Sequence, residues 1–106
     1  MWTKYDEYEL LELFGSEPIY TAPEGTGMFM YSTTSSNGIK LILSLSVHEY
    51  SCTIDLGLFD EGIFEVSLDN VEYLRAESGN SLRIHQKDAV KDYIIYFKPN
   101  IFLKID

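Results

Sequence analysis

Cys52 is the residue best placed for nucleophilic chemistry, because His48 and Glu49 lie only a few positions before it. A cysteine nucleophile needs a base to remove its proton and a third group to orient that base. Cys52, however, is in phase with Tyr50 and Ile54 in an alternating strand pattern, where a thiol acts as a small buried apolar residue. We therefore expect Cys52 in the core and His48 exposed at a bend.

The histidines and carboxylates do not have the spacing of a metal site. Zinc sites need paired cysteine or histidine ligands, and calcium loops need a regular series of oxygen donors. His85 follows Ile84 on the outward side of an expected strand, and the sequence gives it no evident acidic partner. With 17 acids in the chain, some pair always suits general acid–base catalysis, so such a pair has no specificity. We expect no metal, no cofactor and no enzymatic activity.

Residues 3–14 are predicted to form a helix at the start of the chain. Thr3 is the expected N-cap, Asp6 follows three residues later, and Gly15 is the expected C-terminal stop. At about 100° per residue, one broad arc of the helix should face the core. That arc comprises Tyr8, Leu10, Leu11 and Phe14.

Three apolar residues fall on the acidic side of this helix instead: Trp2, Tyr5 and Leu13. They should either pack against the segment Ser16–Gly27 or face a partner. Packing is the preferred interpretation, because that loop segment must pack against another part of the protein surface.

From residue 27 the apolar pattern changes to a period of two, which is typical of strands. Asn37-Gly38 is a strong signal for a hairpin turn. Further turns are expected at Asp60-Glu61-Gly62 and Asp69-Asn70, and a polar connection at Lys87–Asp92. The expected strands are 27–34, 39–47, 50–58, 64–68, 71–76, 82–85, 93–98 and 101–105.

About eight short strands with no helices between them predict an antiparallel sheet. We expect a mainly β (α+β) fold in which a single antiparallel sheet curls into a sandwich or half-barrel, with one N-terminal helix. Residues 1–106 should form a single domain, with the β-rich part at 27–106.

The charges are sorted along the chain. Residues 1–72 carry thirteen acids against Lys4 and Lys40, a balance of −11, whereas residues 73–106 carry four acids against six bases, a balance of +2; together these give the net charge of −9. No Lys or Arg occurs between Glu49 and Glu72. A surface of one sign attracts partners of the opposite sign.

The strand register turns this asymmetry into a predicted surface. If Ile54, Val66 and Tyr73 face the core, acids on three successive strands face outward, and further acids lie at the turns. Phe64, Leu68 and Val71 are expected inward with them. Tyr50, Phe59 and Tyr73 are candidate aromatic anchors. The predicted partner-binding residues are Glu49, Asp55, Phe59, Asp60, Glu61, Glu65, Asp69 and Glu72.

Several classes of protein are disfavoured by the same composition. The N-terminal residues lack a signal-peptide pattern, and the longest apolar run is too short to cross a bilayer. An acidic face is repelled by nucleic-acid phosphates and anionic lipid. The lone cysteine excludes an internal disulfide framework. We expect a cytoplasmic protein that binds neither nucleic acid nor membrane.

In size, acidity, lack of catalytic residues and helix-then-strands order, the chain resembles the small acidic β-rich immunity proteins of bacterial polymorphic-toxin and contact-dependent growth inhibition systems. The resemblance includes no diagnostic motif, so it assigns no residue a role. It implies an inhibitor that neutralises a basic toxin, expected to be a nuclease, through an acidic surface. The alternative is an acidic cytoplasmic accessory or small-ligand-binding domain, in which the charge serves solubility alone.

Overall fold

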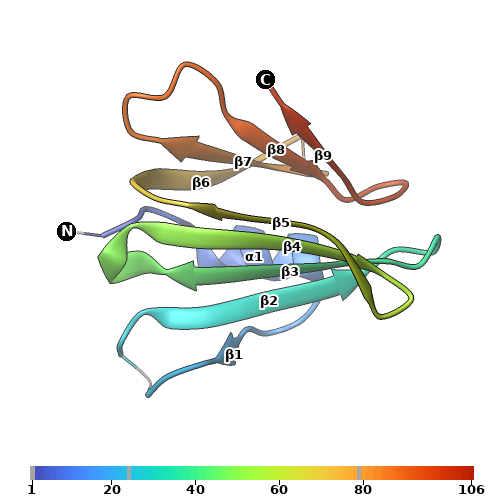
Figure 1. Cartoon of the computed structure of the whole chain (residues 1–106). Coiled ribbons are helices and arrows are strands. Elements are labelled where there is room, and N and C mark those ends of the chain that lie inside the picture. The colour runs from blue at the N-terminus through green and yellow to red at the C-terminus, as the bar shows by residue number, and fades with distance from the viewer. Residues whose placement is uncertain (1, 24, 79) are drawn as a thin grey trace.

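The computed structural model describes residues 2–23, 25–78 and 80–106, whose strands form two antiparallel sheets (Figure 1). The first sheet has the order β1-β2-β3-β4-β5 and the second the order β6-β7-β8-β9. The mainly β, antiparallel fold with an N-terminal helix is therefore confirmed, with the strands divided between two sheets. The elements are α1 (Glu7–Phe14), β1 (Ile19–Tyr20), β2 (Met28–Thr34), β3 (Ile39–Ser46), the 3-10 helix η1 (Val47–Glu49), β4 (Ser51–Leu58), β5 (Glu61–Leu68), β6 (Val71–Glu77), β7 (Ser81–Gln86), β8 (Tyr93–Tyr96) and β9 (Phe102–Ile105).

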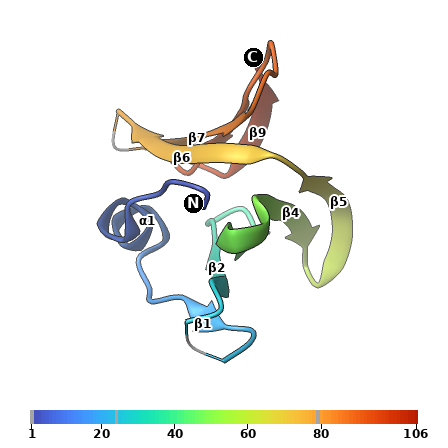
Figure 2. The same cartoon turned by 90° about the vertical axis from the view of Figure 1, so that its left-hand side faces the viewer.

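The core lies between the two sheets. Figure 2 shows them as two layers, with α1 beside the layers on one side and the passage from β5 to β6 on the other. Leu41, Leu43 and Ile54 of the first sheet have no exposed surface, and neither do Ile84 and Ile95 of the second. Burial of these side chains supplies most of the stability of such a sandwich.

Strand β3 has the alternation that its sequence predicts. Leu41, Leu43 and Leu45 are buried, whereas the residues between them lie on the outer face. The Asn37-Gly38 turn is confirmed: Gly38 has a φ of 89°, and Thr34 of β2 pairs with Lys40 of β3. A positive φ of this kind is the reason that glycine is favoured in the turn.

The prediction that Thr3 caps the helix is wrong. Thr3 is fully buried in an extended N-terminal segment, where its Oγ1 donates to the Val71 carbonyl at 2.8 Å and its backbone N–H donates to Val47 at 2.9 Å. Lys4 continues the segment by pairing in parallel with Tyr73 of β6. The segment thus joins the end of the first sheet to the edge of the second.

Helix α1 begins after Asp6, whose side chain accepts from the backbone N–H of Tyr8 at 2.8 Å. It ends at Gly15, which has a φ of 73° and confirms the predicted stop. The buried side of α1 is centred on Leu10 and Phe14, with Leu13 packed beside them. Tyr8 is 74% exposed, contrary to the predicted arc, because it projects about 160° from Leu10 around the helix. No helix in the described ranges is long and apolar enough to cross a membrane.

Two residues predicted to face the core do not fill it. Phe64 lies on β5, the edge strand of the first sheet, and is 41% exposed although it pairs with buried Leu56. Tyr73 lies on the outer face of the second sheet, because the register shifts between Val71 and Tyr73. Such a bulge moves the following side chains to the opposite face, so Leu74 is buried instead.

Candidate functional site

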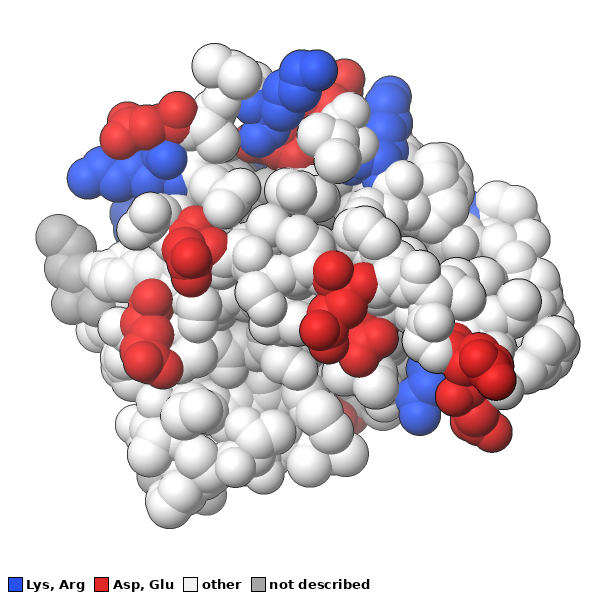
Figure 3. Space-filling model, viewed as in Figure 1, with Lys and Arg blue, Asp and Glu red and all other residues white. Residues whose placement is uncertain are grey.

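The centre of the predicted acidic surface is a pair of carboxylates on the outer face of the first sheet. Asp55 of β4 is directly opposite Glu65 of β5 in the antiparallel ladder. Asp55 is half-buried and Glu65 is exposed. Figure 3 shows the acids of this face as separate groups, while most of the basic side chains visible from this side lie over the second sheet.

A second acidic group lies at the tip of the β4–β5 hairpin. Phe59 and Asp60 form the turn with φ values of 50° and 67°, and Phe59 is 77% exposed. Left-handed backbone costs free energy in residues other than glycine, and such strain is common at functional positions. Glu61, predicted to lie in the turn, instead begins β5 and pairs with Leu58. The hairpin therefore presents an exposed aromatic residue followed in the sequence by two acids, with the Phe59 ring close to Gly38 of the neighbouring turn.

Lys40 interrupts this acidic surface. It lines a hollow of about 200 Å³ together with Asp55, Asp60 and Glu61. Sequence reasoning did not place Lys40 among these acids. Its partner residue in the ladder, Gly57 of β4, is seventeen positions away, and the two meet only through the β3–β4 register. Alternation within β3 predicts that Lys40 faces outward, and that signal could have placed it on the acidic surface.

A third acidic group lies at the opposite end of β4 and β5. Glu49 is exposed in η1, where its Oε1 accepts from Ser46 Oγ at 2.7 Å. Asp69 is exposed where the chain leaves β5, and Glu72 is exposed on β6. A strand of this length spans on the order of 25 Å, so the predicted residues lie in three groups rather than one patch. Glu72 also belongs to the second sheet, contrary to the expectation that three successive strands of one sheet carry the acids.

Two of the three predicted aromatic anchors are engaged within the chain. Tyr50 is half-buried and ends η1 with a φ of 56°. Tyr73 stacks on His85 at 4.9 Å between ring centroids, and the Arg75 guanidinium lies 4.9 Å from the Tyr73 ring centre. Phe59 is the anchor that remains largely exposed.

His85 has an acidic partner that sequence reasoning did not find. Its Nδ1 lies 2.7 Å from Asp92 Oδ1, and its Nε2 lies 3.8 Å from Glu72 Oε1. Arg83 donates to Asp92 at 2.8 Å and to Glu77 at 3.0 Å. This network joins β6 and β7 to the connection before β8. His85 does face outward, as expected.

The network lowers the pKa of both of its principal carboxyl groups. Burial tends to raise the pKa of Asp92, but hydrogen bonds from His85 and Arg83 outweigh that effect and lower it. For Glu77 the hydrogen bond from Arg83 is the main cause of a lowered pKa. Both carboxylates are therefore stabilised in their ionised form.

Cys52 is not arranged as a nucleophile. It is 2% exposed, and burial raises the pKa of its thiol to about 12. The prediction that it is a core residue is confirmed, and His48 is exposed as predicted. Among the described residues, no group of three His, Cys, Asp or Glu side chains could hold a metal ion.

Comparison with known proteins gives one informative similarity. No family model matches the chain, and no curated protein matches it significantly. The fold is similar to that of a chain in the contact-dependent growth inhibition toxin–immunity protein complex from Klebsiella pneumoniae 342. The TM-score is 0.83 at 25% sequence identity, and the match covers 100% of this chain and 98% of the other. This whole-chain similarity supports the immunity-protein character that the sequence indicated.

Proposed function

We propose that this chain is an immunity protein that binds and neutralises a growth-inhibition toxin. The observation that carries the proposal is the whole-chain similarity to a chain of a toxin–immunity protein complex, at a TM-score of 0.83. The similarity extends over both chains almost completely, so it concerns the whole architecture rather than a common β-hairpin motif.

The proposed partner is a basic toxin domain with nuclease activity. A nuclease must attract a polyphosphate, so its cleft carries positive charge. A net charge of −9, with acids on the outer face of the first sheet, fits such a cleft. Complementary charge accelerates association and disfavours wrong partners.

The proposed contact surface follows β4 and β5 from Glu49 to the hairpin tip. The opposed carboxylates Asp55 and Glu65 lie at its centre, and the remaining acids lie toward its two ends. Phe59 supplies an exposed ring beside Asp60 and Glu61. A large apolar side chain surrounded by polar groups is typical of residues that dominate binding energy. The complete proposed set is Glu49, Asp55, Phe59, Asp60, Glu61, Glu65, Asp69 and Glu72.

In this proposal the protein acts by occupying the toxin, in the cytoplasm of the cell that it protects, and it catalyses no reaction. Three groups of acids, at the centre and the two ends of β4 and β5, can follow a positive cleft without a large rearrangement on binding. Because inhibition by occupying the toxin involves no chemistry on this chain, the proposal includes no cofactor.

The proposal is tested by examining the reading frame adjacent to the gene of this chain for a basic toxin domain and by purifying that domain as the candidate partner. Purified chain should form a one-to-one complex whose affinity falls steeply as salt is raised, and it should block the toxin's cleavage of RNA or DNA. Absence of binding even at low salt would contradict the proposal. Growth arrest caused by expression of this chain alone would also contradict it, since that outcome would identify the chain as a toxin.

A further inference from the structure

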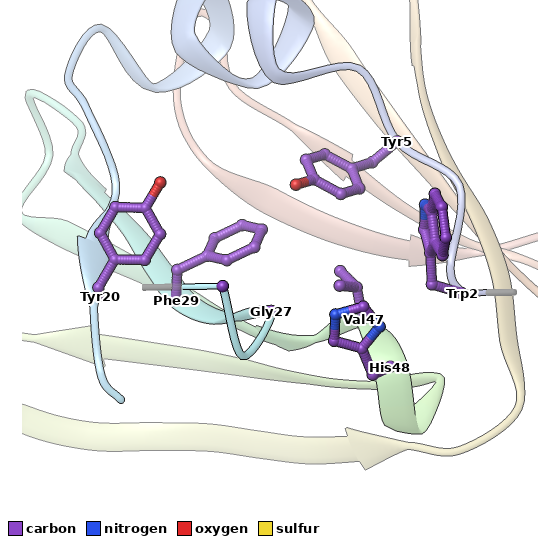
Figure 4. A pocket seen from close by; sticks show the side chains of 8 residues that line it. Trp2, Tyr5, Tyr20, Gly27, Phe29, Val47 and His48 are labelled. Carbon is purple, nitrogen blue, oxygen red and sulfur yellow. The ribbon is translucent and has the colours of Figure 1, made fainter. Parts of the chain in front are cut away.

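An aromatic pocket lies at the end of the first sheet, next to the acidic group around Glu49. It has a volume of about 430 Å³, and Figure 4 shows its lining side chains. Trp2 and Tyr5 reach it from the N-terminal segment before α1, Tyr20 from β1, and Phe29 from β2. His48 of η1 completes the wall.

The rings are held by one another and by the core. Tyr5 and Tyr20 lie 5.5 Å and 6.0 Å from Phe29 between ring centroids, and Phe29 is only 4% exposed. Trp2 contacts His48 edge to face at 6.1 Å and 82°. Trp2 and Tyr20 nevertheless remain 56% and 53% exposed. The pocket therefore has a fixed inner wall and two large rings open to a partner.

Gly27 is required at this wall. Its φ is 74°, and a Cβ there would lie 2.6 Å from Val47 Cγ2 and 2.7 Å from His48 Cδ2. Only glycine allows β2 to approach η1 so closely. The close approach positions the His48 ring opposite Trp2.

The surroundings of the pocket are negative on the side of Asp6 and Glu7. Its described lining contains no Lys or Arg, and an adjoining hollow that shares Trp2 and Tyr5 is lined by Asp6 and Glu7. The pKa of Tyr5 is raised, first by burial and then by the charges of Glu7 and Tyr20. A cation placed among these rings is attracted both by their faces and by the acids beside them.

A second neighbouring hollow has mixed charge and does not suit a cation in the same way. It also contains Trp2, but Lys4 and Lys87 line it together with Glu72. Trp2 thus separates a hollow with two lysines from the aromatic pocket.

We propose that the aromatic pocket receives an arginine side chain of the basic toxin. This inference rests on the proposed function and names one anchoring contact within it. A guanidinium is planar and stacks on aromatic faces, which an ammonium group does less well. His48 of the pocket wall is followed in η1 by Glu49, so this contact would extend the proposed binding surface around the end of the sheet.

Trp2 is the single tryptophan of the chain, so its fluorescence reports on this pocket and on the two hollows that share Trp2, and the Tyr20→Leu variant assigns a response to the pocket. The probes are N-acetylarginine amide, N-acetylcitrulline amide, which has a similar shape without the charge, and N-acetylleucine amide. The arginine probe should change Trp2 emission saturably and bind at least about tenfold more tightly than the other two. Tyr20→Leu should abolish the saturable change, whereas Phe102→Leu, at a similarly exposed aromatic residue on the second sheet, should preserve it. Equal binding of citrulline, tighter binding of leucine, or no saturable response would overturn the inference.

Measuring the affinity for the toxin domain distinguishes failure of this inference from failure of the proposed function. Tyr20→Leu should weaken the complex with the toxin domain by at least about tenfold, and Phe102→Leu should leave its affinity unchanged. If wild-type chain binds the toxin and Tyr20→Leu binds equally well, the pocket inference fails while the proposed function stands. If wild-type chain does not bind the toxin at all, the proposed function fails, and the pocket then has no toxin arginine to receive. Both variants alter exposed side chains, and equal far-UV circular dichroism would confirm that they fold.

Discussion

Asp55 and Glu65 are cross-strand neighbours, directly opposite each other on β4 and β5. Like charges opposite each other in a sheet reduce stability. No ion pair among the described residues includes either carboxylate. The chain thus maintains a local electrostatic repulsion at the centre of the surface that we assign to toxin binding.

Removing one of these charges should stabilise the free protein. We expect Glu65→Gln to raise the free energy of unfolding by about 0.2–1 kcal/mol, because it relieves the repulsion with Asp55. Glu17→Gln, at an exposed acid outside the sheet, makes the same change in net charge and serves as the control. Urea unfolding at low ionic strength measures both. Equal stabilisation by the two variants would mean that overall charge, and not the opposed pair, is responsible.

The hydroxyl of Thr3 should make a large contribution to stability. Thr3→Val keeps the shape of the side chain but leaves the Val71 carbonyl without this donor, so we expect a loss of about 1–3 kcal/mol in the free energy of unfolding. Thr3→Ser keeps the hydroxyl and should lose less. Denaturant midpoints distinguish the two variants. A Thr3→Val protein as stable as wild type would show that the hydrogen bond from the Thr3 hydroxyl to Val71 contributes little to stability.

Acid should weaken the network around Asp92. Because the pKa of Asp92 is lower in the folded state than its usual value of 3.8, its stabilising effect is complete above that value and is lost as pH falls through the folded pKa. Asp92→Asn should therefore be less stable than wild type near neutral pH and should lose less stability below about pH 4. Asp88→Asn, at an exposed residue of the same connection, is the control.

The measurement for this network is the urea midpoint across the acid range. Glu77 has a lowered pKa as well, so part of the acid sensitivity should survive in Asp92→Asn. Parallel pH profiles for wild type and Asp92→Asn would contradict the assignment.

Cys52 should be unreactive while the protein is folded. The thiol is 2% exposed and has a pKa of about 12, so little of the reactive thiolate exists near neutral pH. A chromogenic disulfide reagent should label Cys52 only at the rate of unfolding, and immediately in denaturant. Rapid stoichiometric labelling of the native protein would show that the site is accessible.

The fold class could be predicted because strong local signals agree with the tertiary structure. The alternation of Leu41, Leu43 and Leu45 and the turn at Asn37-Gly38 both survive in the structure. The division into two sheets could not be predicted in the same way, since Asp69-Asn70 reads as an ordinary turn. In the structure that turn instead carries the chain from one layer to the other.

The candidate site was harder to predict, because its composition depends on register. One bulge next to Glu72 places Tyr73 outside instead of inside. The β3–β4 pairing brings Lys40 among acids that are distant from it in the sequence. The pairing of His85 with Asp92 depends on how the connection before β8 folds back on the sheet. Alternation alone contains none of this information.

Growth rescue tests the central claim most directly. Cells that produce the candidate toxin domain are supplied with wild-type chain, with the combined variant Asp55→Lys, Glu65→Lys and Glu72→Lys, or with a control. The control reverses Glu12, Glu17 and Asp106, which are exposed acids outside the proposed surface, and so makes the same change in net charge. Circular dichroism and urea unfolding are first used to check that all three proteins fold.

We expect wild-type chain and the control to restore growth, and the surface variant to fail because charge complementarity with the toxin is lost. In vitro, the association rate of the surface variant with the toxin should fall by at least about tenfold at low salt. Rescue by the surface variant equal to that of wild type would contradict the assigned surface. Failure of wild-type chain to restore growth would contradict the immunity function itself.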